Sequence, residues 1–242
     1  MKPIFPSQNR PNVHFAELQL SYFLMIETLF ENQDLIVVNK PEGMAAIPER
    51  QKNPPPAESL YEWLCAQRGE ELFIVHRIDK GTSGVILYAR NAEAHRRMSL
   101  QFQRRLVRKE YLALVHGVVA ADEGAIDKPL GQHGSGRVAV NPQHGRESYT
   151  EYRVLHRFPA YTLVEAYPKT GRRHQIRVHL YSLGHPIVGD RLYGDRTIQR
   201  DYPRMMLHAC KLTIRLLNGE LLTVEAPPPE SFERMLQMAD TQ

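Results

Sequence analysis

The chain has 242 residues, 42% of them hydrophobic and 24% charged, and a formal net charge of +4 at pH 7. These values are ordinary for one large globular domain or two fused subdomains, and they exclude a collagen-like, coiled-coil or wholly disordered chain. The mildly basic balance permits nucleic-acid binding without establishing it.

Membrane, secretory and metal-binding signals are weak. The strongest apolar run, residues 15–24, is interrupted by polar side chains such as Glu17, so it predicts neither a membrane span nor a signal peptide. The two cysteines, Cys65 and Cys210, form no CxxC pair and indicate reduced core residues rather than a structural zinc site. We therefore expect a cytoplasmic protein without a membrane segment or a bound metal.

The first 25 residues are rich in Pro, Asn and Gln and show no clean periodicity. We expect residues 1–25 to be an N-terminal appendage that is flexible or not native, with Met25 as the native start. The folded domain would then comprise residues 26–242, and it begins with strand-like runs at 26–32 and 35–41.

The next segments alternate loops, strands and helices. Residues 48–57 form a proline-rich polar loop that we expect to be mobile, and residues 58–68 have helical spacing. Strand-like runs at 73–76 and 84–89 flank a polar turn. A helix then begins at Asn91 as N-cap. Its apolar face is predicted at intervals of four residues: Ala94, Met98, Phe102 and Leu106.

The second half of the chain contains strand signals in clusters, at 109–119, 148–155, 161–167, 205–216 and 221–225. One helix is predicted over 172–183, closed by Gly184, and another at the C-terminus. Because strands and helices rarely alternate strictly, the order favours an α+β sheet with helices around it over a doubly wound sheet.

The turn between the strands at 73–76 and 84–89 contains Asp79, with Arg77 two residues before it. A rigid scaffold can present such a charged loop to a ligand. The alternative is that Asp79 only forms the turn and Arg77 is a solvated surface charge, and the local pattern alone favours this alternative.

Two basic segments follow. Residues 94–109 contain six Lys or Arg residues, including Arg105 and Lys109, and no acid, so they can follow a phosphate backbone. The alternative is the solvated face of an amphipathic helix, although such faces usually mix both signs. Residues 169–177 concentrate further cations at the start of a predicted helix: Lys169, Arg172, Arg173, His174 and Arg177.

Cations at a helix N-terminus oppose the helix dipole, so the second basic segment indicates a bound phosphate or an internal carboxylate. Arg177 is flanked by Ile176 and Val178, and we expect it to point inward and pair with a carboxylate such as Asp79.

Other residues carry weaker signals. Tyr111 alternates with apolar neighbours and, on this pattern alone, is a core aromatic. His174 and His179 are five residues apart and no HExxH occurs, so no metal site is predicted. Residues 131–136, GQHGSG, are predicted as a loop without the context of a phosphate-binding motif.

Taken together, six motifs resemble the RluA family of pseudouridine synthases in their residues, order and spacing: NKPEGM (39–44), HRIDKGTSG (76–84), KEYLALVHG (109–117), KTGRRHQIRVHL (169–180), GHPIVGD (184–190) and LHA (207–209). The resemblance extends over residues 26–227 and overrides the plainer interpretations above. It implies an α+β fold with a bent, mostly antiparallel mixed sheet, flanking helices and a central cleft.

The resemblance also implies roles for single residues. Asp79 would be the catalytic aspartate, Tyr111 the proton-transfer aromatic beside the target base, and Arg177 the salt-bridge partner of Asp79. Arg77 would fill the space of the extruded nucleotide. RNA-backbone contacts are expected from Arg105, Lys109, Arg172 and His174.

By the same resemblance the chain is a short member without an S4-like domain, acting as a monomer on tRNA, large-subunit rRNA or both. The implied reaction flips a uridine out of its stack, breaks the bond from N1 to C1′ and rejoins the ring through C5. No cofactor or metal is needed for this isomerisation. Whether Asp79 attacks C1′, adds to C6 or removes the C2′ proton stays open.

Two rival functions remain. An RNA-binding module or chaperone could use the same basic surface, but it would have no use for Asp79. A carboxylate-dependent glycosidase or nucleosidase usually needs a pair of acids across the scissile bond, and the strong motifs offer one.

Overall fold

The computed structural model describes residues 26–49, 58–134 and 136–241. The predicted appendage at 1–25 and all but the first two residues of the predicted loop at 48–57 lie outside the described residues. Among the helices of the described residues, none is long and apolar enough to cross a membrane.

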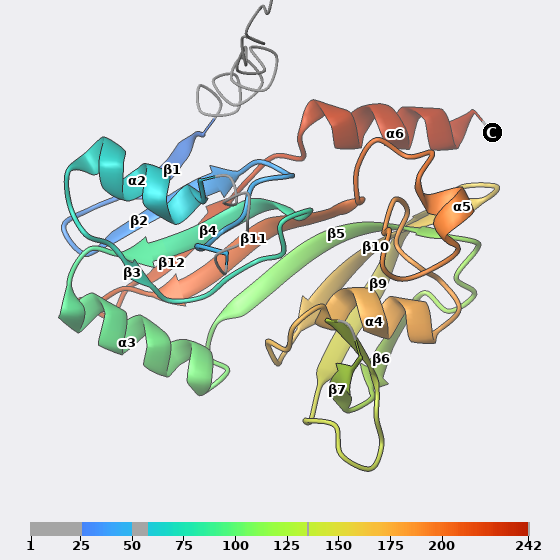
Figure 1. The fold of residues 1–242 in the computed structure, drawn as a ribbon, viewed down its shortest axis with the longest axis horizontal. Coiled ribbons are helices and arrows are strands. Elements are labelled where there is room, and N and C mark those ends of the chain that lie inside the picture. Colours follow the sequence, from blue (N-terminus) through green and yellow to red (C-terminus); the bar gives the residue numbers. More distant parts are fainter. Residues whose placement is uncertain (1–25, 50–57, 135, 242) are drawn as a thin grey trace, which may run out of the picture.

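One ten-stranded sheet forms the centre of the molecule, as Figure 1 shows. Its strands are β1 (Thr28–Glu31), β2 (Leu35–Lys40), β3 (Phe73–Ile74), β4 (Ser83–Ala89), β5 (Arg108–His116), β6 (Glu123–Asp127), β9 (Tyr149–Arg157), β10 (Tyr161–Pro168), β11 (Leu207–Arg215) and β12 (Leu221–Glu225). The main path runs β1-β2-β4-β11-β5-β10-β9-β6, with β12 beside β11 and β3 beside β4. Among the described strands only β4 and β11 pair in parallel, so the predicted α+β, mostly antiparallel sheet is confirmed.

The half of the sheet around β2 and β4 is covered on both faces. In β2, Leu35 and Val37 face a cluster that includes helix α3 (Ala92–Gln103), whereas Ile36 and Val38 face a cluster that includes helix α2 (Leu60–Arg68). Alternate side chains of a strand point to opposite faces, which explains why a continuous apolar run is buried here.

Both of these helices begin at capping residues. The predicted N-cap Asn91 accepts a hydrogen bond from the Ala94 amide, and Ser59 forms a reciprocal capping box with Glu62 at the start of α2. Such caps satisfy backbone N–H groups that have no partner within the helix.

The other half of the sheet is formed by β5, β10, β9 and β6. Its core cluster contains residues of β5 and β10 together with helices α4 (Gln175–Ser182) and α6 (Glu230–Asp240). In Figure 1, β5 runs as a long strand from beside α3 toward the side of α4 and α6, and so joins the two halves. A short helix, α5 (Arg196–Gln199), lies near the edge.

Three sequence-based predictions are wrong. Helix α3 ends at Gln103, so Leu106 is not on its core face but 66% exposed. Helix α4 begins at Gln175, so Lys169, Arg172 and Arg173 lie in the loop before the helix and His174 is its N-cap, whereas only Arg177 lies in its first turn. Residues 131–133 of the predicted loop belong to strand β7 (Leu130–His133), which pairs with β8 (Arg137–Val140).

Candidate active site

A cavity of about 450 Å³ opens between α3, β5 and the start of α4. All eight residues that were expected to act in catalysis or RNA binding line it: Arg77, Asp79, Arg105, Lys109, Tyr111, Arg172, His174 and Arg177. Segments that are up to 100 residues apart in sequence therefore meet at one place, between the two halves of the sheet.

Asp79 lies in the turn before β4, and the fold fixes the backbone of this turn. The Thr82 amide donates to the Asp79 carbonyl at 3.0 Å, and the Gly43 amide donates to the Lys80 carbonyl at 2.8 Å. The fully buried Lys40 ammonium donates to the carbonyls of Pro41 and Met44 and, at 3.3 Å, to that of Lys80.

Gly84 allows this turn to enter the sheet. Its φ of +110° is a left-handed conformation, and a Cβ at this position would lie 2.2 Å from the carbonyl oxygen of Ala209 on β11. Only glycine combines this φ with such a close backbone approach. The parallel pairing of β4 with β11 begins here and positions the Asp79 turn above the centre of the sheet.

The side chain of Asp79 pairs with Arg177, as the sequence predicted. Arg177 Nη1 donates to Asp79 Oδ2 at 2.8 Å, and the two side chains are 7% and 19% exposed. The second carboxylate oxygen, Oδ1, lies 4.0 Å from His174 Nε2, beyond hydrogen-bonding distance. One oxygen is thus tied to the guanidinium and the other is directed elsewhere.

Asp190 is a partner of Arg177 that the sequence interpretation missed. Its fully buried carboxylate accepts from Arg177 Nε at 2.7 Å and from Nη2 at 2.8 Å, which is a bidentate pair. Burial alone would lower the pKa of Arg177, but the hydrogen bonds and charge of Asp190, together with Asp79, raise it above its ordinary value. Arg177 therefore stays charged, held from behind by Asp190 while it faces Asp79.

Tyr193 completes this support. Its ring centroid lies 5.1 Å from the Arg177 guanidinium carbon, close enough for a cation–π contact. Its hydroxyl group accepts from the Val138 amide of β8 at 3.0 Å and lies 2.8 Å from His174 Nδ1. Burial lowers the pKa of His174 to about 4, and Arg177 and Arg173 act in the same direction, so His174 is neutral at pH 7 although Asp79 opposes the shift.

A signal for these partners was present in the sequence. Asp190 is the last residue of the quoted GHPIVGD motif, and Tyr193 follows it closely. A guanidinium has five N–H donors in a planar fork, so a buried arginine can serve two carboxylates rather than one. A search for a second acid beside Arg177 would have found Asp190.

Tyr111 and Lys109 lie on β5 and form the floor of the cavity. Tyr111 is paired in register with Ala209 of β11 and Ala166 of β10, at the centre of the sheet. Burial raises its pKa, and the charge of Asp79 adds to the shift, so the phenol is protonated at neutral pH. Burial also lowers the pKa of Lys109 to about 8, and its ammonium donates to the Thr170 carbonyl at 2.9 Å.

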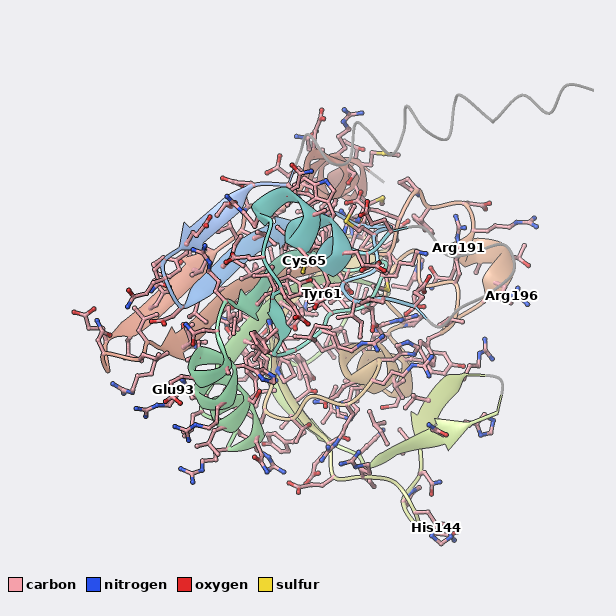
Figure 2. The ribbon with its side chains drawn as sticks, turned by 60° about the vertical axis from the view of Figure 1, so that its left-hand side comes forward. Tyr61, Cys65, Glu93, His144, Arg191 and Arg196 are labelled. Atoms are coloured by element: carbon pink, nitrogen blue, oxygen red, sulfur yellow. The ribbon has the colours of Figure 1, made fainter. Side chains whose placement is uncertain are left out.

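The first basic segment is less one-sided than its sequence indicated. Glu93, just outside residues 94–109, forms ion pairs with Arg96 at 2.8 Å and with Arg97 at 3.1 Å. Figure 2 shows Glu93 on the outer side of α3. This end of the helix is a solvated face of mixed sign, and of this segment only the later part, including Arg105 and Lys109, reaches the cavity.

The chemistry of the cavity is that of a single acid. Asp79 is the only Asp or Glu among the described residues that line it. No group of three His, Cys, Asp or Glu side chains in the described part of the chain could hold a metal ion. Both cysteines are free and half-buried, away from the lining.

A family model described as RNA pseudouridylate synthase matches residues 34–182 of this chain. The protein named "Uncharacterized RNA pseudouridine synthase YlyB" of Bacillus subtilis is 37% identical over 226 residues, which cover 88% of this chain and 72% of that protein. The "Dual-specificity RNA pseudouridine synthase RluA" of Vibrio cholerae is 37% identical over 224 residues, which cover 89% of each chain.

The fold has solved relatives as well. The structure titled "Human RNA Pseudouridylate Synthase Domain Containing 1" matches with a TM-score of 0.73 and 27% identity, over 90% of this chain and 95% of that chain. A second human structure, "RNA Pseudouridylate Synthase Domain Containing 4", has the same TM-score at 24% identity and shows the shared fold.

Proposed function

Since the chain belongs to the RluA family of RNA pseudouridine synthases, isomerases that act on RNA, we propose that Asp79 is its catalytic residue and that Arg177 orients it. The ion pair between Arg177 Nη1 and Asp79 Oδ2 at 2.8 Å carries this assignment, because it holds the lone acid of the cavity in one orientation. A charge-assisted hydrogen bond of this length is strong enough to fix the orientation of the carboxylate.

The cavity suits a nucleotide that has left its stack. Its volume of about 450 Å³ lies within the range of about 300–1,000 Å³ that is usual for small-ligand sites. We assign to Asp79 Oδ1, which Arg177 does not hold, the contact with the reacting nucleotide. Flipping the base costs a few kcal/mol, which contacts between the protein and the RNA backbone can offset.

Tyr111 is proposed to form the wall against the flipped base and to assist proton transfer at C5. Its ring lies on the central strand of the sheet, where the cavity floor is fixed by pairing on both sides. Because its pKa is raised, the hydroxyl group enters the reaction protonated.

The remaining lining residues are proposed to hold the RNA. Arg77 is exposed at the cavity and would fill the space that the flipped nucleotide leaves. Arg105, Lys109 and Arg172 are proposed to contact phosphates. His174 is neutral at pH 7, so we assign it a hydrogen-bonding and positioning role rather than a charge contact.

We propose that the substrate is a uridine in large-subunit rRNA, in tRNA or in both, and that the enzyme acts in the cytoplasm as a monomer without a cofactor. The names of the relatives support the substrate class. The "Ribosomal large subunit pseudouridine synthase D" of Haemophilus ducreyi is 32% identical over 234 residues, and the Vibrio cholerae relative carries the name of a dual-specificity enzyme.

The test is a map of pseudouridines in the tRNA and rRNA of a strain that lacks the gene. At least one pseudouridine should disappear, and the wild-type gene should restore it while a gene with Asp79→Asn should not. An unchanged map, or restoration by the Asp79→Asn gene, would reject the proposal.

A further inference from the structure

A cluster of three residues lies at the mouth of the cavity and is called the mouth cluster here: Arg105, Glu147 and Arg172. Arg105 donates from Nη1 and Nη2 to the two carboxylate oxygens of Glu147 at 2.9 and 3.0 Å. Arg172 Nε donates to the backbone carbonyl of Glu147 at 3.0 Å. Both arginines line the cavity, and Glu147 contacts it through Arg105.

The pair between Arg105 and Glu147 joins the two halves of the molecule. Arg105 follows α3, which packs on β3 and β4, whereas Glu147 precedes β9 in the other half of the sheet. Figure 1 shows the end of α3 and the start of β9 on opposite sides of β5. The pair therefore lies beside the cavity that contains Asp79 and connects its two sides.

The backbone at Arg105 supports a specific placement of its side chain. Its φ of 60° is one of only two left-handed values at non-glycine residues in the described part of the chain. The second belongs to His174, which also lines the cavity. At Arg105 this conformation terminates α3, because the Leu106 amide donates to the Gln101 carbonyl at 2.9 Å and the Arg105 amide donates to the Phe102 carbonyl at 3.2 Å, the bonding pattern of a helix C-terminal cap. The cap fixes the direction in which the Arg105 side chain leaves the helix.

Charge explains what Glu147 does in the cluster. Burial lowers the pKa of the Arg172 guanidinium, the charges of Arg146 and Arg105 lower it further, and Glu147 alone acts against the shift. The mouth is therefore a concentration of arginines with one carboxylate among them. A bidentate arginine binds a phosphate through the same fork of two parallel N–H donors that it offers to a carboxylate.

The Glu147 carboxylate can also separate from Arg105 at little cost in free energy. The side chains of Arg105 and Glu147 are 44% and 64% exposed. Ion pairs this exposed contribute little to stability, because water solvates both partners when they separate.

We propose that the Glu147 carboxylate occupies the place of an RNA phosphate, so that Arg105 and Arg172 form a phosphate subsite that RNA fills by displacing Glu147 from Arg105. This proposal rests on the proposed function, which takes RNA as the ligand and assigns phosphate contacts to Arg105 and Arg172, and it adds the role of Glu147. Glu147 then acts as a competitor that an incoming phosphodiester has to replace.

The test measures binding rather than isomerisation. The probes are the tRNA fraction and the large-subunit rRNA fraction from a strain that lacks the gene. The fraction that the wild-type protein binds more tightly is used for all variants. Filter binding gives the dissociation constant. Glu147→Gln should tighten binding about threefold, because the phosphate no longer competes with an ion pair. Arg105→Gln should weaken it about tenfold, because a charge-assisted contact is lost.

Two controls separate competition from general repulsion. Glu93→Gln makes the same charge change on the outer side of α3, where Glu93 is 51% exposed, and should change binding by less than about 1.5-fold at physiological salt. In a protein that already carries Arg105→Gln, the added Glu147→Gln change should give no tightening. A gain that persists there would mean that Glu147 repels RNA by charge alone.

Weaker or unchanged binding by Glu147→Gln, or a persisting gain in the double variant, overturns the subsite. The outcome is independent of catalysis, since Asp79 is untouched in every variant. If the binding measurements reject the subsite, the assignment of the isomerase activity is unaffected. If Asp79→Asn does not abolish isomerisation, the binding result is unaffected.

Discussion

The two ends of the cavity use the same interaction in opposite ways. At the inner end Arg177 is 7% exposed and binds two carboxylates, one of them the fully buried Asp190. At the mouth Arg105 is 44% exposed and binds one carboxylate, which is 64% exposed. Both arginines form bidentate pairs with bonds of similar length, so geometry alone does not distinguish them.

Burial distinguishes them. Breaking a buried pair strands a charge where water cannot solvate it, whereas separating an exposed pair costs little. The inner end is therefore suited to hold a catalytic group in place, and the mouth is suited to exchange one anion for another.

Arg177→Met is the strongest test of this contrast. It leaves Asp190 fully buried and Asp79 largely buried without their common partner, so the free energy of unfolding should fall by about 3–5 kcal/mol. Activity should be lost as well. Urea denaturation measures the first effect, and an unfolding midpoint equal to that of the wild type would contradict the structural role of the inner pair.

Tyr193→Phe tests the layer behind the pair. The ring that faces Arg177 remains, but the Val138 amide loses its acceptor and His174 loses its hydrogen bond. An unsatisfied buried N–H costs about 1–3 kcal/mol, so urea denaturation should show a loss of that order. A larger loss for this variant than for Arg177→Met would reverse the ranking.

The lowered pKa of Lys109 predicts that RNA binding depends on pH. Its pKa is lowered to about 8 in the folded protein, so its positive charge is present below pH 8 and is lost as the pH rises through 8. RNA affinity should therefore decrease between pH 7 and 9, by about threefold if one phosphate contact is weakened. Lys109→Gln should remove this part of the pH dependence, and an identical pH profile in the variant would exclude Lys109 as its source.

The smallest expected effect is that of mouth-cluster substitutions on the thermal stability of the protein. Arg105→Gln and Glu147→Gln should each leave the melting temperature within about 1 °C of the wild-type value, because the pair is solvent-exposed. Differential scanning calorimetry checks this. A large decrease in either variant would show that the pair is part of the framework and would remove the contrast with the inner end.

Much of the fold was predictable because local pattern determines it. The cap at Asn91, the buried run of β2 and the strand β12 follow from capping chemistry, burial and alternation. Strands β6, β7 and β8 were missed because glycine interrupts or borders each of them: Gly124 lies in β6, Gly131 lies in β7 and Gly136 precedes β8. The exposed Leu106 was misplaced because the end of α3 depends on a left-handed residue that no periodicity indicates.

The site was predictable as a set of residues but not as a network. The motifs identified Asp79 and Arg177, and the expected ion pair between them is present. Asp190, Tyr193 and Glu147 were not assigned, because the motifs gave Arg177 one carboxylate partner and the sequence does not show which further side chains pack against it or against Arg105. Which acid pairs with which arginine is a property of the folded arrangement.

The most direct test of the central claim is the turnover of purified Asp79→Asn on RNA from the strain that lacks the gene, with RNA binding and the melting temperature measured on the same sample. Arg177 keeps its bidentate pair with Asp190 in this variant, so folding and binding should be nearly unchanged while pseudouridine formation is abolished. Pseudouridine formation at the wild-type rate would contradict the assignment of Asp79 as the catalytic residue.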